Sequence, residues 1–231
     1  IKEAMEMNPN VLLRGIDVYK GLSIRRERDT IRKIHQGGYF NQTEGLFELF
    51  AHDPGRIHNT PVAELDVLKY ALGMSTTSTD PEAIKNALRI LVDFQYADYG
   101  IEAWPAWHVL SHVLYTTGGK ITRPVGVLLP SGAVAGGGTM HSHEVAAKAL
   151  QTPSGVDVFY TSDPETTYKL LRYCLLYENN PYIFMVDKTN IFQKEEFEIG
   201  TGFFEPGRGR VVKEGSGIQI ISFGPMVNKA I

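Results

Sequence analysis

Short apolar runs alternate along this chain with longer segments in which apolar residues recur every three or four positions. The short runs predict buried strands, and the longer segments predict helices that cover them. This alternation is typical of βαβ units, so we expect an α/β fold with a mostly parallel sheet flanked by helices. The predicted strands are residues 11–15, 57–59, 87–94, 124–129, 156–160 and 182–186.

Helices are predicted between these strands. An acid before a proline, at Asp80-Pro81 and Asp163-Pro164, marks the start of two of them, and the second extends to Tyr177. The charged segment 23–36 predicts a further helix, inserted after the first strand with its basic residues on a solvated face. The other helices are predicted at residues 1–7, 43–50, 64–72 and 100–115.

The last part of the chain differs in composition. Residues 188–209 are rich in glycine, proline and charge, which predicts a linker. Residues 210–213 and 218–222 then predict a hairpin or the opening strands of a second α/β domain. We therefore expect one domain over residues 1–195, and a linker with the start of a truncated C-terminal domain over residues 196–231. The absence of an initiator methionine agrees with a piece of a longer protein.

Composition narrows the class of protein. With 43% hydrophobic and 21% charged residues, the chain of 231 residues resembles soluble globular proteins. No apolar run approaches the roughly 18 to 20 residues that span a bilayer, and no leader opens the chain, so we expect a cytoplasmic protein without a membrane partner. The 23 basic against 26 acidic residues give no electrostatic footprint for nucleic acid. The single cysteine, Cys174, excludes a disulfide framework and predicts a buried apolar position.

The first candidate for chemistry is Glu64. Segment 59–64, with the sequence Asn-Thr-Pro-Val-Ala-Glu, places its carboxylate just beyond a proline turn and directly before an apolar helical run. One interpretation is ordinary: an acid in the first turn meets the positive end of a helix dipole. The other interpretation is a carboxylate held for acid-base chemistry. The residues alone leave both open.

A second candidate is the glycine-rich segment 130–144, which follows a predicted buried strand. Loops at the carboxyl edge of a parallel sheet bind ligands in open α/β folds. The segment fits neither a P-loop nor a dinucleotide fingerprint, which argues against a plain nucleotide-binding domain. Its histidines, His141 and His143, would face opposite sides of an extended segment, which disfavours a metal site. A general acid-base or substrate-contacting histidine is the preferred interpretation.

Five short motifs follow one another in order: Gly37-Gly38-Tyr39-Phe40 with Thr43-Glu44-Gly45-Leu46, segment 59–64, Tyr96-Ala97-Asp98-Tyr99, the glycine-rich segment 130–144, and Glu178-Asn179-Asn180-Pro181. This order resembles the beta subunits of thiamine-diphosphate-dependent 2-oxoacid dehydrogenases. These are the pyruvate and branched-chain decarboxylating components, and their pyrimidine-binding domain is shared with transketolases. The resemblance covers about residues 5 to 230 and implies the thiamine-diphosphate-binding fold.

The resemblance implies thiamine diphosphate as the cofactor and gives Glu64 a role. In that family a buried carboxylate holds a proton at the pyrimidine ring nitrogen, which requires apolar surroundings that raise the pKa of the carboxyl group. Val62, Leu65 and Val67 are consistent with such surroundings.

Other site residues are also implied by the resemblance. Tyr99 matches the aromatic position that packs on the pyrimidine ring, with Tyr96 close by, although tyrosines at a strand end also occur in ordinary cores. His141 matches the active-site histidine that helps to bind substrate and the lipoyl group. His143 stands where many beta subunits have glutamine, so its role is less defined.

A metal site is implied near the end of the predicted helix 163–177. Glu178 and Asn180, with the carbonyl of Leu175, match the region that in many members holds a structural potassium ion. The same residues are equally consistent with a helix C terminus closed by an asparagine ahead of Pro181.

Two features depart from the family. Residues 15–17 read Gly-Ile-Asp where the family has Gly-Glu-Asp, so Ile16 replaces an acid near the cofactor. No Gly-Asp-Gly occurs in the chain, so magnesium and the diphosphate must be held mainly by an alpha subunit or another domain. The implied assembly is an α2β2 heterotetramer with its active site at an interface.

The resulting hypothesis is oxidative decarboxylation of a small 2-oxoacid, with transfer of the acyl group to a lipoyl-bearing acyltransferase. Two alternatives stay open from the sequence. One is transketolase-like transfer of a two-carbon ketol unit. The other is a non-catalytic, degenerate partner subunit, which Ile16 motivates.

Overall fold

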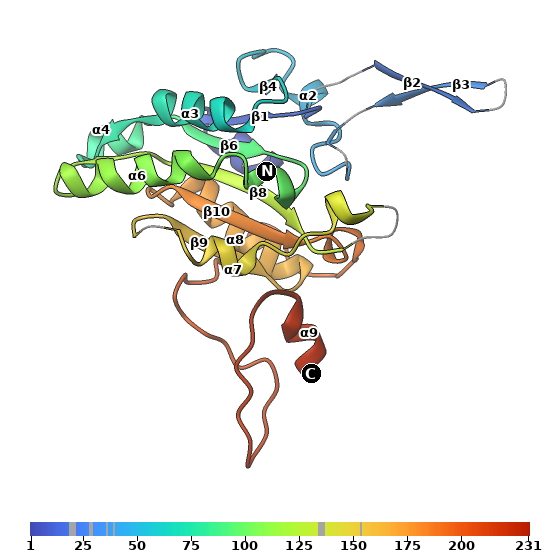
Figure 1. The fold of residues 1–231 in the computed structure, drawn as a ribbon, viewed down its shortest axis with the longest axis vertical. Coiled ribbons are helices and arrows are strands. Elements are labelled where there is room, and N and C mark those ends of the chain that lie inside the picture. The colour runs from blue at the N-terminus through green and yellow to red at the C-terminus, as the bar shows by residue number, and fades with distance from the viewer. Residues whose placement is uncertain (19–21, 28–29, 36, 39, 134–136, 153) are drawn as a thin grey trace.

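One parallel sheet organises the chain. The computed structural model describes residues 1–18, 22–27, 30–35, 37–38, 40–133, 137–152 and 154–231. In these residues six strands pair in parallel in the order β4-β1-β6-β8-β10-β9, which confirms the predicted α/β architecture (Figure 1). All six predicted strands are present: β1 (Val11–Gly15), β4 (Ile57–Asn59), β6 (Arg89–Asp93), β8 (Val125–Ser131), β9 (Asp157–Thr161) and β10 (Tyr182–Asp187).

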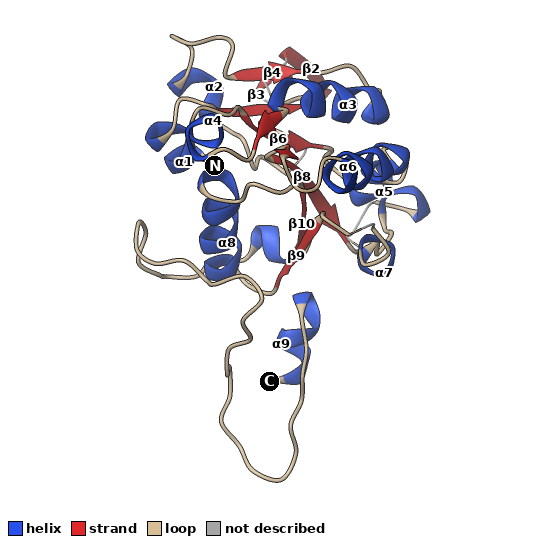
Figure 2. Ribbon diagram, turned by 90° about the vertical axis from the view of Figure 1, so that its left-hand side faces the viewer, coloured by secondary structure: helices blue, strands red, loops and turns tan. Residues whose placement is uncertain are grey.

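The sheet carries a hydrophobic core on each face. Every residue of β1, β6, β8 and β10 is buried, as expected for strands covered on both sides. Successive side chains point to opposite faces, so Leu12 belongs to one core and Leu13 to the other. The first core is covered by α3 (Glu64–Ser75), α6 (Trp104–Thr116) and α7 (Ala146–Ala149), and the second by α1 (Lys2–Met7), α2 (Leu46–Leu49) and α8 (Pro164–Leu176) (Figure 2).

Shorter elements join these layers. The helix expected at residues 100–115 is present as α6, which begins later, at Trp104, and the short α5 (Ala97–Gly100) precedes it. The acid before a proline starts α8 and the short α4 (Pro81–Lys85) as predicted. None of the described helices is long and apolar enough to cross a lipid bilayer. The remaining elements are β5 (Thr77–Ser78), β7 (Ile121–Thr122), η1 (Thr139–His141), η2 (Asn190–Phe192), η3 (Gly224–Met226) and α9 (Val227–Ala230).

The helix predicted over residues 23–36 is wrong. The chain there forms two antiparallel strands, β2 (Leu22–Glu27) and β3 (Thr30–His35), with Arg25 opposite Arg32. The segment is rich in β-branched residues, which lose side-chain freedom in a helix and favour a pleated strand. This hairpin projects away from the body of the fold (Figure 1).

The hairpin predicted near the C terminus is also wrong. Residues 193–223 contain no strand, although Val211, Ile218 and Ile221 have strand-forming side chains. These side chains are exposed, and no sheet lies beside them to pair with their backbone groups. The segment forms an extended loop that reaches away from the sheet (Figure 1). The domain boundary near residue 195 stays a prediction.

Helix capping gives a test of this fold. The Asp163 carboxylate accepts a hydrogen bond from the Thr166 amide at 2.7 Å, at the start of a helix whose inner face packs in the core. We expect Asp163→Ala to lower the free energy of unfolding by about 1 kcal/mol in urea denaturation. Asp80→Ala is the matched control, because Asp80 caps the short α4, which buries no residue. An equal or larger loss in the control would contradict this ranking.

Candidate functional site

The candidate site lies at the edge where the parallel strands end. Because parallel strands share one direction, the last residues of β1, β6, β8 and β10 meet along one edge of the sheet. Tyr96 and Tyr99 follow β6 and His141 follows β8, whereas Glu64 follows β4, which pairs with β1. The backbone amide of Thr60 donates to the carbonyl of Gly15, the last residue of β1, at 2.9 Å. This bond fixes the proline turn before Glu64 to the strand edge.

Glu64 is the first residue of α3 and only 7% exposed. Its Oε1 atom is buried and has no hydrogen-bond partner among the described residues, and the same holds for Oγ1 of Thr60. No side chain caps the start of α3. A buried carboxyl oxygen without a partner costs free energy, so this atom fits a ligand that brings a hydrogen-bond partner.

The apolar surroundings of Glu64 differ in part from those expected. Val67 is buried and Leu65 packs against the core below α3. Val62 is 73% exposed, because it lies in the turn before the helix rather than on its inner face. It therefore makes no apolar wall around the carboxylate.

Three aromatic rings gather around the second candidate. Tyr96 and Tyr99 lie at the start of α5, and His141 ends η1. The His141 ring stacks on Tyr96 with 4.3 Å between ring centroids and meets the edge of Tyr99 at 5.5 Å. The structure thus brings together three predicted site residues from segments that are about forty positions apart in sequence. The Nδ1 atom of His141 is buried without a partner in the described part of the chain.

The extended conformation expected around His141 and His143 is wrong. Residues 139–141 form a 3₁₀ turn, so the alternation of side chains along an extended strand does not apply to His141 and His143. The exposed His143 ring places Nδ1 3.0 Å from Oδ1 of Asp98. Within the described residues no group of three or more histidine, cysteine or acidic side chains is arranged to hold a metal ion.

The turn proposed for potassium is held by a buried arginine. The Arg89 guanidinium donates to the carbonyl of Glu178 at 2.7 Å and to Oδ1 of Asn179 at 2.6 Å. The amide of Asn180 donates to Oε1 of Glu178 at 3.0 Å, and its side chain donates to Asp157 at 3.2 Å. The helix α8 has already ended at Leu176, before either asparagine. These contacts hold the turn together through its side chains, and the potassium site at Glu178, Asn180 and the carbonyl of Leu175 stays a prediction.

Sequence analysis missed Asp93, which ends β6 and is completely buried. It accepts hydrogen bonds from the amide of Gln95 at 2.9 Å and from Nε2 of Gln42 at 2.8 Å. Burial raises the pKa of this carboxyl group to about 6, although both hydrogen bonds oppose the shift. The sequence feature that could have identified Asp93 is an acidic residue at the carboxyl end of an apolar strand.

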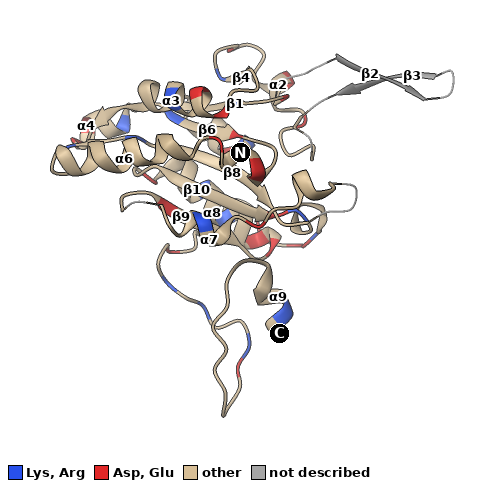
Figure 3. Cartoon of the chain, viewed as in Figure 1, with Lys and Arg blue, Asp and Glu red and all other residues tan. Residues whose placement is uncertain are grey.

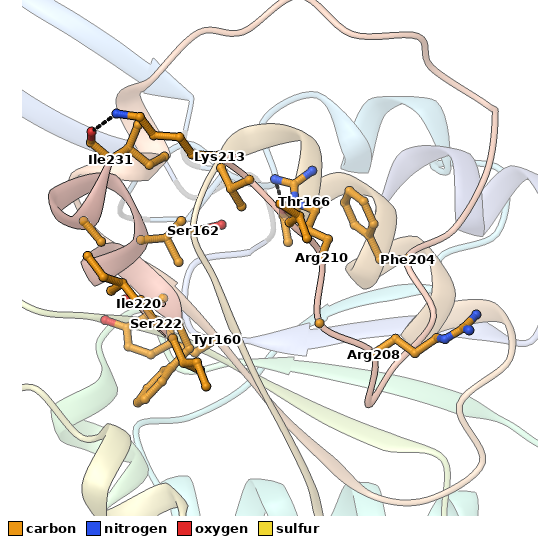
Figure 4. A pocket seen from close by; sticks show the side chains of 18 of the residues that line it. Tyr160, Ser162, Thr166, Phe204, Arg208, Arg210, Lys213, Ile220, Ser222 and Ile231 are labelled. Carbon is orange, nitrogen blue, oxygen red and sulfur yellow. Dashed lines mark hydrogen bonds between the residues drawn. The ribbon is translucent and has the colours of Figure 1, made fainter. Parts of the chain in front are cut away.

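A large cavity lies away from these residues. A space of about 1600 Å³ opens between residues 203–231 and the side of β9 and α8, with Tyr160, Thr166 and Arg210 among its lining (Figure 4). Neither Glu64 nor His141 lines it. It is enclosed largely by the extended C-terminal loop, so we do not assign the candidate chemistry to it.

Comparison with known proteins gives the family. The model of the transketolase pyrimidine-binding domain matches residues 1–193. This chain belongs to that family. The pyrimidine-binding domain is therefore shown for most of the chain, as the order of motifs indicated.

Several curated relatives are beta subunits. The chain is 26% identical over 198 residues to the pyruvate dehydrogenase E1 component subunit beta of Bacillus subtilis, covering 84% of this chain and 57% of that protein. It is 30% identical over 235 residues to the mitochondrial 2-oxoisovalerate dehydrogenase subunit beta of Dictyostelium discoideum, covering 97% and 59%. It is 25% identical over 232 residues to the acetoin:2,6-dichlorophenolindophenol oxidoreductase subunit beta of Cupriavidus necator, covering 100% and 63%. The chain thus spans about three fifths of the length of these relatives.

A solved structure supports the fold of this pyrimidine-binding domain. An inactive beta4 tetramer of a split-gene transketolase superposes with a TM-score of 0.64 at 19% identity. The match covers 99% of this chain and 61% of the other. At this identity the likeness concerns the fold alone.

The raised pKa of Asp93 predicts a pH dependence. The folded domain binds this proton more tightly than the unfolded chain, so the stabilisation is complete below about pH 4 and is lost as the pH rises through about 6. When the pH is raised from 4.5 to 7.5, the free energy of unfolding of Asp93→Asn should rise relative to that of the unchanged chain, by at most about 3 kcal/mol. Urea denaturation at both pH values measures this difference. The control Asp66→Asn alters an exposed carboxylate on α3. A stability difference for Asp93→Asn that does not change with pH would contradict the assignment.

Proposed function

We propose that this chain supplies the pyrimidine-binding half of a thiamine-diphosphate site in a 2-oxoacid dehydrogenase of the E1 type. The observation that carries the proposal is the buried, unpartnered Oε1 atom of Glu64 at the carboxyl edge of the sheet. The family match and the beta-subunit relatives support the proposed class of cofactor and reaction.

Glu64 holds a proton at the pyrimidine ring nitrogen in this proposal. Its buried oxygen, which lacks a partner among the described residues, can share a hydrogen bond with a ring nitrogen through the carboxyl proton. Thr60 offers a second buried and unpartnered oxygen in the same turn. Bound thiamine diphosphate would supply the thiazolium carbon that attacks the substrate carbonyl.

Tyr96, Tyr99 and His141 form the apolar and substrate-facing part of the proposed site. The partly buried Tyr99 gives an aromatic surface for the pyrimidine ring, and the buried Tyr96 meets it edge to face at 6.0 Å. His141 is fixed against both rings, while its Nδ1 atom lacks a protein partner. We assign it to contacts with the 2-oxoacid and with the lipoyl group that accepts the acyl fragment.

The proposed partner holds the other half of the cofactor. The chain contains no Gly-Asp-Gly, so an alpha subunit or domain would bind magnesium and the diphosphate, in an α2β2 assembly. The surface of α6 supports a partner, because the helix carries no charged residue (Figure 3) and Tyr115 on it is 85% exposed. Uncharged surface with an exposed aromatic residue is typical of the central part of protein interfaces.

Two-carbon ketol transfer and a non-catalytic role are the alternatives. The curated relatives favour the dehydrogenase class over ketol transfer, since the three described above are oxidoreductase subunits. Ile16, at the position of a family acid, is the feature that motivates a non-catalytic subunit. An assay of the whole complex distinguishes them.

The test uses the native complex, co-purified with its partner. Thiamine diphosphate binding is measured by calorimetry, and turnover with a panel of 2-oxoacids, acetoin and ketose donors. We expect binding in the unchanged complex, and a loss of turnover of about 10²-fold or more in Glu64→Gln, because the amide cannot hold the proton. Asp66→Asn is the matched control, with the same change of charge on the exposed side of α3.

Two results would overturn the proposal. One is an unchanged complex that binds no thiamine diphosphate. The other is full activity in Glu64→Gln. Turnover of ketose donors in place of 2-oxoacids would instead support ketol transfer.

A further inference from the structure

Lys188 is the most deeply buried cation near the candidate site. It follows β10 directly, and its side chain is 0% exposed. The ammonium group donates to the carbonyl of Gly132 at 2.9 Å and to the carbonyl of His141 at 2.7 Å. Gly132 begins the glycine-rich loop and His141 lies near its end. One buried charge therefore holds two points of the loop that are nine residues apart.

Asp98 holds the same loop from α5. Its Oδ2 atom lies 3.8 Å from the Lys188 ammonium. Its Oδ1 atom accepts a hydrogen bond from the backbone amide of His143 at 3.2 Å, and the amide of Gly132 donates to the carbonyl of His143 at 3.0 Å. The two ends of the loop are thus joined to each other and to an opposite pair of charges.

Tyr96 connects Lys188 to the imidazole of His141. The Lys188 ammonium lies 4.9 Å from the centre of the Tyr96 ring, within the range of a cation–π contact. The His141 ring stacks on the same tyrosine at 4.3 Å. Lys188 therefore contacts both the backbone of His141 and the ring on which its imidazole rests.

A lysine at this position has an energetic cost. Fully buried lysines are rare, and apolar residues of similar volume often stabilise a core better than a buried ion pair. Burial lowers the pKa of Lys188, and Asp98, Asp187 and Glu144 oppose this shift. Its hydrogen bonds to two loop carbonyls offset part of this cost.

We propose that Lys188 is a positioning residue that clamps the loop from Gly132 to His143 and so fixes the imidazole of His141 against Tyr96. The inference rests on the proposed function for the role of His141, but the clamp itself concerns only residues of this chain. It requires that loss of the cation release the loop while leaving the Glu64 part of the site intact.

The test compares Lys188→Met with Lys148→Met in the full complex with the partner. Methionine keeps the length of the side chain and removes its charge. Lys148 is the matched control, because its ammonium also lies over an aromatic ring, Trp104, at 5.2 Å, but on the half-buried α7. Hydrogen exchange read by mass spectrometry reports on the amides of residues 132–133 and 137–143, with the amides of α3 as the internal reference.

We expect Lys188→Met to speed exchange in the loop by about tenfold or more, with α3 unchanged, since each lost hydrogen bond to a charged group is worth a factor of this order. The Kd for thiamine diphosphate should stay within about twofold of the unchanged complex, because Glu64 does not contact the clamp, whereas kcat should fall by about tenfold or more. A merely structural role would weaken cofactor binding together with turnover.

A second variant covers the case in which Lys188→Met fails to fold. Asp98→Asn keeps an acceptor for the His143 amide but removes the charge beside Lys188, so it should speed loop exchange in the same direction by a smaller factor. Unchanged loop exchange in the folded variant, or equal effects from Lys148→Met, would overturn the clamp. An unchanged complex that binds no thiamine diphosphate overturns the proposed function instead, and the exchange measurements then decide the clamp alone.

Discussion

The structure depends on the burial of four neighbouring strands on both faces of one parallel sheet. Because β1, β6, β8 and β10 admit almost only apolar side chains along their length, polar groups are confined to the places where the strands end. These strands end at one edge of the sheet, with the last residues Gly15, Asp93, Ser131 and Asp187. The position of the candidate site therefore follows from the packing of the sheet, and the loops only decide which side chains face it.

Buried polar groups in this domain fall into two classes. Arg56 is buried, yet its guanidinium donates to the carbonyls of Val11, Met5 and Asn8, so its hydrogen-bonding capacity is used to hold the chain together. In the described part of the chain, Glu64 and His141 each keep a buried atom without a hydrogen-bond partner, as does Asp98, whose Oδ2 atom lies 3.8 Å from the Lys188 ammonium. Each such atom costs about 1 to 3 kcal/mol, which a structural role would not require. At Glu64 and His141 the missing partner, rather than burial itself, points to a ligand.

Sequence patterns predicted the strands well because each is a short apolar run between turn residues, and this signal is local. They failed over residues 22–35, where charge suggested a solvated helix and β-branched residues favoured the hairpin that forms. They failed again at residues 210–222, where strand-forming side chains have no sheet to join. The order of motifs predicted four site residues, Glu64, Tyr96, Tyr99 and His141. It did not predict the roles of Asp93, Asp98 and Lys188, because these side chains bind partners that are distant in sequence. Lys188, for example, donates to a carbonyl 56 residues away.

The division of the proposed cofactor site between two chains has a physical consequence for this one. In the described part of the chain, buried polar atoms of Glu64, Thr60 and His141 have no hydrogen-bond partner, which makes this half of the site costly when it stands alone. A ligand that brings hydrogen-bond partners to these atoms removes that cost only in the folded domain, and so adds to its stability in proportion to its binding. A partner subunit that holds the ligand and also packs against an uncharged helix such as α6 would be stabilised both by ligand binding and by the interface. The polar atoms left without partners at the sheet edge thus favour assembly as well as chemistry.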